Sequence, residues 1–150
     1  MKNSELEHKI TNIIDSAKAK EQKLQEICDF LKKAISYYDW VGFYFRNGLE
    51  EELILAQFSG EPTEHKVIPF GKGICGQVAV SNKSFVVQDV SEQDNYLSCG
   101  FNVKAEIVIP IFKNGLNIGQ IDIDSHKKNP FTKNDEIILE FVGEQVSKII

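Results

Sequence analysis

Two cysteines in unlike local settings are the residues of this chain best suited to redox chemistry. Cys75 lies in the glycine-rich segment 71–76, and Cys99 lies in a polar segment beside Gly100. A thiol becomes nucleophilic when a helix N-terminus, backbone N–H groups or a nearby cation favours its thiolate. A helix starting near Cys75 would favour its thiolate through unpaired N–H groups. The backbone beside Gly100 can bend freely, so the sulfur of Cys99 would be accessible. A structural interpretation stays open for both: Cys75 as a small buried residue of the turn, and Cys99 as an incidental loop residue.

Three acidic residues follow the second cysteine at spacings that bring them together on a sheet. Asp122 and Asp124 are two residues apart in a strand-like segment, so their side chains leave the same face, whereas Ile121 and Ile123 take the other. Glu106 opens the preceding strand and could lie across from Asp122 or Asp124, depending on the register. Neighbouring acids repel one another unless their face meets water or a ligand. The pattern therefore indicates either a site that binds a cation or holds a proton, or a solvated sheet face.

The aromatic segment 40–45 offers a possible wall for a ligand. Trp40 and Tyr44 alternate onto one side of the expected strand with Gly42 between them, which would leave room for a ligand. Burial in a core is the commoner fate of such aromatics. Cys28 shares an apolar helical face and is interpreted as a core residue.

Composition limits the class of protein. The 150 residues are 42% hydrophobic and 26% charged, which fits one globular domain over residues 1–150. No apolar run reaches the length of a membrane span and the N-terminus lacks a signal peptide, so we expect a cytoplasmic protein without a membrane partner. The net charge of −5, without a cluster of basic residues, argues against a nucleic-acid partner.

The cysteines and histidines do not predict a metal centre. Three cysteines in a cytoplasmic chain are not a disulfide framework, and no Cys-x-x-Cys or Cys/His spacing is present. His8, His65 and His126 are scattered. We therefore expect neither a metal nor a cofactor.

The elements that would position these residues follow from hydrophobic periodicity and turn signals. Two amphipathic helices open the chain, the first with Ser4 and Glu7 as a capping box and the second from about Glu21 to Ser36. Two hairpins are expected, segments 40–45 and 52–58 around Asn47-Gly48, and segments 106–112 and 117–124 around residues 113–115. Between them lie a short helix over 74–80, a short strand over 85–87 and a long polar segment over 89–103. Thr132 and Asp135 cap a final helix.

The order of elements predicts an α+β domain. Two helices and two strands precede a strand–helix–strand unit, and two further strands and a helix end the chain. We expect a mostly antiparallel sheet with helices packed on one face and loops covering a pocket on the other.

Taken together, several motifs in order resemble the free methionine-(R)-sulfoxide reductase family, whose members are small stand-alone GAF domains. The motifs are Trp40–Tyr44, Phe70–Gly76, Gln88–Val90, Cys99, Glu106–Pro110 and Ile121–Ser125. The resemblance runs from about Trp40 to the C-terminus, and it implies a pocket for free L-methionine-(R)-sulfoxide.

The resemblance also implies a role for each site residue. Cys99 would attack the sulfoxide and Cys75 would resolve the product by forming a disulfide, which a thioredoxin-like reductant would reduce. Three acids would hold the ammonium group of the substrate and assist protonation of its oxygen: Glu106, Asp122 and Asp124. Two aromatic residues would line the pocket around the methyl-sulfoxide end of the substrate: Trp40 and Tyr44.

Two positions depart from the pattern of the family. His65 stands where members usually carry a further cysteine, so recycling must use Cys75 or an outside thiol. Gly100 stands where members usually have Asp directly after the nucleophile. A non-catalytic GAF module that binds a small molecule or senses redox state is the alternative function. The sequence leaves open whether a homodimer forms through the N-terminal helices.

Overall fold

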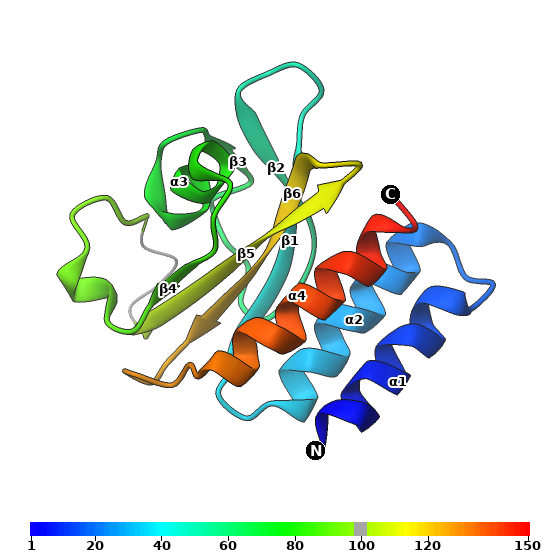
Figure 1. Cartoon of the computed structure of the whole chain (residues 1–150). Coiled ribbons are helices and arrows are strands. Elements are labelled where there is room, and N and C mark those ends of the chain that lie inside the picture. The colour runs from blue at the N-terminus through cyan, green and yellow to red at the C-terminus, as the bar shows by residue number, and fades with distance from the viewer. Residues whose placement is uncertain (98–101) are drawn as a thin grey trace.

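The computed structural model describes residues 1–97 and 102–150 and contains one six-stranded antiparallel sheet with helices on both faces (Figure 1). Cys99 and Gly100 lie outside the described residues. The elements in chain order are α1 (Asn3–Asp15), α2 (Lys20–Ala34), β1 (Trp40–Arg46), β2 (Glu52–Ser59), β3 (Val67–Pro69), α3 (Gly73–Ser81), β4 (Phe85–Val87), the short 3-10 helix η1 (Val90–Glu92), β5 (Ala105–Lys113), β6 (Leu116–Ser125) and α4 (Lys133–Ser147).

The sheet joins the two predicted hairpins through their strands β1 and β6. The strand order is β3-β2-β1-β6-β5-β4, and every neighbouring pair is antiparallel. Both hairpins and the α+β class are therefore confirmed. The first strand of the strand–helix–strand unit is β3, for which the sequence suggests no bounds because the segment 60–69 carries two prolines, Pro62 and Pro69.

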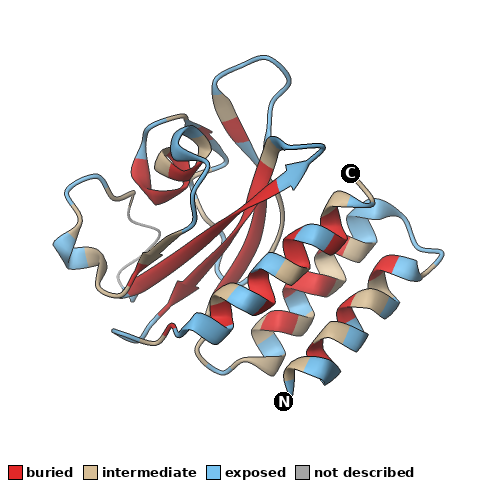
Figure 2. Ribbon diagram, viewed as in Figure 1, coloured by how far each residue is buried: buried red, intermediate tan, exposed pale blue. Residues whose placement is uncertain are grey.

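One face of the sheet is covered by α1, α2 and α4, which lie side by side in Figure 1. Their apolar faces bury against the strand residues that point the same way, including Val41, Phe43, Ile121 and Ile123. Figure 2 shows the buried residues running along the central strands and the inner sides of these helices. Cys28 is fully buried in this core, as the helical periodicity predicts. The opposite face is left to α3 and the connecting segments.

The two predicted helix caps have different outcomes. Thr132 begins α4 as expected, and its backbone N–H donates to the Asp135 carboxylate at 2.8 Å. The predicted capping box of Ser4 and Glu7 is wrong, because α1 begins at Asn3 and places Ser4 inside its first turn. Lys2 is the N-cap instead, without a side-chain hydrogen bond. No helix in the described part of the chain combines the length and apolarity that a membrane span requires.

Candidate active site

The start of α3 brings Cys75 onto the face of the sheet that the other helices leave open. Gly73, the first residue of α3, has a φ of +64°, which favours glycine. Gly76 packs so closely that a Cβ there would lie 2.7 Å from the Pro69 carbonyl oxygen. The Gln120 side-chain amide on β6 donates to the Cys75 carbonyl at 3.1 Å. These contacts hold the Cys75 side chain against the sheet.

The Cys75 thiol lies against two of the three predicted acids. Its Sγ is 3.3 Å from Asp122 Oδ2 and 3.9 Å from Glu106 Oε2. The thiol therefore donates mainly to Asp122. Asp124 also acts electrostatically on this thiol. The sequence predicted the acids as a group, and the fold adds the thiol to that group.

The register of β5 and β6 explains how the acids meet. Glu106 pairs with Asp124, and Val108 pairs with Asp122, so the Glu106 side chain projects from the same face as both aspartates. All three acids are buried, with exposed fractions of 4% for Glu106, 2% for Asp122 and 1% for Asp124. The solvated-face interpretation is therefore wrong: α3 packs on β5 and β6, and Leu97 lines the same cavity as Glu106 and Asp122.

Burial changes the proton affinity of this cluster. Burial foremost, and then the charges of Asp122 and Glu106, raise the pKa of Cys75 well above its ordinary value. Burial also raises the pKa of Asp122, although hydrogen bonds from Glu106 and Cys75 act in the opposite direction. Repulsion among crowded acids is thus not the main cause of the shift at Asp122. The cluster consequently favours a protonated thiol at Cys75 and a proton on the Asp122 carboxyl group.

The two predicted aromatic residues occupy different places around this cluster. Tyr44 lines the cavity beside Cys75 and its hydroxyl donates to the His65 carbonyl oxygen at 2.8 Å. Trp40 lies outside the described cavity lining and stacks on Phe58, with ring centroids 5.6 Å apart. Its own indole occupies the space over Gly42, where a Cβ would lie 2.2 Å from the ring.

The cavity beside the thiol is very small. Its volume is about 10 Å³, about the space that one water molecule requires. Its described lining is Tyr44, His65, Ile68, Gly73, Ile74, Cys75, Leu97, Glu106 and Asp122. His65, the first of the two positions at which the sequence departs from the pattern it resembles, therefore lines the same cavity. An amino acid could enter only if some of these side chains moved.

Asn95 is a residue that the sequence did not single out, and it ties the long polar segment to α3. Its side chain accepts from the Gly73 backbone N–H at 2.8 Å and donates to the Gly71 carbonyl at 2.7 Å. Gln77 on α3 donates to the Asn95 carbonyl at 3.0 Å. The signal for Asn95 was weak, because one polar residue among many in this segment has no periodicity. Gln120 could have been found, because it alternates with Asp122 and Asp124.

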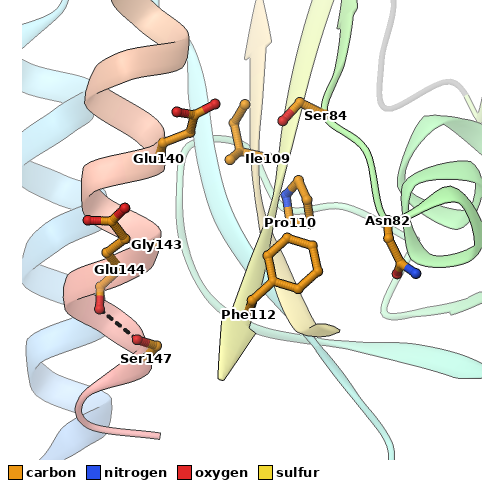
Figure 3. A pocket seen from close by; sticks show the side chains of 9 residues that line it. All are labelled: Asn82, Ser84, Ile109, Pro110, Phe112, Glu140, Gly143, Glu144 and Ser147. Carbon is orange, nitrogen blue, oxygen red and sulfur yellow. Dashed lines mark hydrogen bonds between the residues drawn. The ribbon is translucent and has the colours of Figure 1, made fainter. Parts of the chain in front are cut away.

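A larger groove lies away from this cluster, between α4 and β5 (Figure 3). Its volume is about 350 Å³ and it carries two acids of α4, Glu140 and Glu144, opposite Pro110 and Phe112 of β5. The residues that line it include no cysteine and no histidine. The redox chemistry available to the described residues is therefore concentrated at Cys75.

The sheet order, the helix layer and the covered acidic face define the fold of a GAF domain, and residues 20–150 match the GAF domain family. The free methionine-R-sulfoxide reductase of Escherichia coli is 31% identical over 120 residues, which are 80% of this chain and 71% of that protein. The protein of the same name from Saccharomyces cerevisiae is 37% identical over 112 residues, 73% of this chain and 62% of that one.

A solved structure gives the same relationship. The free methionine-R-sulfoxide reductase of Neisseria meningitidis, solved in complex with its substrate, superposes with a TM-score of 0.91. It is 31% identical, and the match covers 98% of this chain and 87% of that one. The chain belongs to the free methionine-R-sulfoxide reductase family, which confirms the resemblance found in its motifs.

Proposed function

We propose that this protein reduces free L-methionine-(R)-sulfoxide to L-methionine with its own thiols as the reductant. The observation that carries the proposal is the buried cluster of Cys75, Glu106 and Asp122, in a chain that belongs to this reductase family. The cluster supplies a thiol and proton-holding acids in one covered site. A reaction that consumes protons and thiol electrons needs both.

Cys99 is the proposed attacking thiol. Its assignment rests on the motif of the family, since it lies outside the described residues. The raised pKa of Cys75 supports the division of roles, because a protonated buried thiol is a poor nucleophile. The sulfur of Cys99 attacks the sulfoxide sulfur, and the sulfoxide oxygen passes to Cys99 as methionine leaves. The sulfoxide is thereby reduced to methionine, and Cys99 is oxidised to a sulfenic acid.

The buried acids are the proposed proton donors and the site for the ammonium group. Asp122 is the best candidate donor, because its raised pKa favours a proton that can move to the sulfoxide oxygen. Glu106 and Asp124 lie on the same face and would share the positive charge of the substrate. Tyr44 would line the pocket around the methyl-sulfoxide end of the substrate. Trp40, whose ring lies beside that of Tyr44, would line it as well.

Cys75 is the proposed resolving thiol. Its sulfur attacks the sulfenic acid of Cys99, a disulfide forms, and the hydroxyl group leaves as water. Asp122 Oδ2 lies 3.3 Å from the Cys75 sulfur and can accept the thiol proton in this step. A thioredoxin-like dithiol then reduces the disulfide by exchange.

The experiment is NADPH consumption with thioredoxin and thioredoxin reductase, with the R and S sulfoxides of free methionine offered separately. We expect turnover of the R form only. We further expect Glu106→Gln to lower kcat/KM by about 10²-fold or more. Glu140→Gln removes the same charge from the exposed groove of Figure 3 and should leave kcat/KM unchanged.

A non-catalytic GAF module is the second candidate, and the small volume of the cavity is the observation in its favour. A module of this kind would bind methionine sulfoxide without consuming NADPH. Cys99→Ser separates the two functions, because it abolishes turnover of an enzyme and leaves the affinity of a binding module intact.

A further inference from the structure

The thiol–acid cluster has the composition and geometry of a metal site with three protein ligands. Cys75 Sγ, a carboxylate oxygen of Glu106 and a carboxylate oxygen of Asp122 all lie within 4.8 Å of one another. They come from three elements, α3, β5 and β6. Without relying on the reductase activity, we propose that this cluster binds one thiophilic divalent cation, zinc or its analogues.

The separations between the ligand atoms match those of a tetrahedral zinc site. Zinc bonds of about 2.3 Å to sulfur and about 2.0 Å to oxygen put the sulfur and each oxygen roughly 3.5 Å apart at a tetrahedral angle. The observed separations from the Cys75 sulfur are 3.3 Å to Asp122 and 3.9 Å to Glu106. These two separations thus differ from the tetrahedral value by only a few tenths of an ångström.

A second observation at Asp122 points to a ligand. Its Oδ1 atom is buried and has no hydrogen-bond partner among the described residues, although its side chain lines the cavity. A buried carboxylate oxygen without a partner is destabilising, and a cation held by both oxygens of Asp122 would remove that penalty. The cavity of about 10 Å³ is too small for an amino acid but has the size for one ion.

The chemistry of the ligand set selects the cation. A thiolate with two carboxylates favours zinc, cobalt or cadmium over magnesium and calcium, which take oxygen ligands only. Binding forms one metal–sulfur bond and metal–oxygen bonds to both carboxylates, and it releases to solvent the thiol proton and the proton that Asp122 holds. The fourth position stays open to water, as in zinc sites with three protein ligands. No spacing in the sequence indicated this site, because Cys75 and Asp122 are 47 residues apart.

The test is a cobalt titration of the reduced full chain. The protein carries no histidine tag, and the titration is performed under anaerobic conditions. We expect a thiolate-to-cobalt charge-transfer absorption in the near ultraviolet, which one equivalent of zinc displaces. Cys75→Ser should abolish this absorption, and Asp122→Asn should weaken cobalt binding about tenfold or more. Cys28→Ser, in the core on the other face of the sheet, should retain it, and so should Cys99→Ser.

The proposal is overturned if no charge-transfer band forms, if Cys75→Ser retains the band, or if only Cys99→Ser loses it. Circular dichroism checks that each variant is folded. A second readout is thermal unfolding, in which zinc should raise the Tm of the wild type and not that of Asp122→Asn. Because neither readout uses turnover, cobalt binding and the reductase activity can each fail separately.

Discussion

At the scale of single residues, the fold changes the acid–base chemistry of Asp122. Its ordinary pKa is 3.8, and burial raises that value because water no longer solvates the charge. The hydrogen bond from the Cys75 thiol to its Oδ2 opposes this rise of the pKa but is the smaller effect, and its Oδ1 is buried without a partner among the described residues. Folding therefore favours the neutral acid, which suits a proton donor.

This shift predicts a pH-dependent stability. The folded state binds the proton of Asp122 more tightly than the unfolded state, so its stabilising contribution is fully present below pH 3.8 and is lost as pH rises through the folded pKa. We expect the free energy of unfolding of the wild type to fall relative to that of Asp122→Asn as pH rises above 3.8. Urea unfolding of both proteins across this range measures the difference. A difference that is constant with pH, or that grows in favour of the wild type, would contradict the account.

At the scale of elements, the site depends on the hydrogen bonds between the segment after β4 and α3 with the turn before it. The side chain of Asn95 makes two hydrogen bonds to the glycine-rich turn, at Gly71 and Gly73. Gln77 adds a third between the same two elements. These hydrogen bonds position the segment that leads to Leu97, and Leu97 lines the cavity. Cys99 follows two residues later in the sequence.

We expect Asn95→Ala to weaken both stability and turnover. Two lost hydrogen bonds correspond to about 1–3 kcal/mol of unfolding free energy. A displaced nucleophile should lower kcat/KM by about tenfold or more. Asn47→Ala is the matched control, because the amide of Asn47 makes only a long hydrogen bond of 3.4 Å at the far hairpin. Equal kcat/KM values for the Asn95 variant and the wild type would show that the hydrogen bonds of Asn95 do not position the active site.

At the scale of the whole molecule, Asp135 joins the segment before β1 to the start of α4. Its Oδ1 accepts hydrogen bonds from the hydroxyls of Tyr37 at 2.8 Å and Tyr38 at 2.7 Å. Its Oδ2 accepts the backbone N–H of Thr132. Burial, followed by the charge of Asp135, raises the pKa of Tyr38. This buried network connects α4 to β1 on the side of the sheet opposite the proposed active site.

We expect Asp135→Ala to lower the free energy of unfolding by about 3 kcal/mol or more, because each bond to a buried charge contributes about 1.5–3 kcal/mol. Glu136→Ala, one residue further along, removes only a loose pair with Lys133 and should change stability by less than about 1 kcal/mol. Urea unfolding measures both variants. A loss for Asp135→Ala no larger than that of the control would contradict this role.

The sequence predicted those parts of the fold that depend on local patterns. Alternation placed Asp122 and Asp124 on one face and Ile121 and Ile123 on the other, and the structure confirms this division. Turn signals predicted both hairpins, and the spacing of Thr132 and Asp135 predicted the N-terminal cap of α4. The resemblance of the motifs gave the family.

Contacts between distant segments could not be predicted in the same way. The approach of Cys75 to Asp122 depends on how closely Gly76 packs on Pro69, and nothing local in the sequence specifies that packing. Burial of the three acids depends on the segments that cover them, so the spacing alone could not exclude a solvated face. Lys2 caps α1 without a side-chain bond, which no sequence pattern favours.

The most direct measurement of the central claim is a single turnover without an external reductant. The fully reduced protein is mixed with an excess of free L-methionine-(R)-sulfoxide, methionine is quantified, and the disulfide-linked peptides are identified by mass spectrometry. We expect one methionine per chain and a disulfide that joins the peptides of Cys75 and Cys99. Release of no methionine, with Cys75 and Cys99 both still reduced, would contradict the proposed reductase.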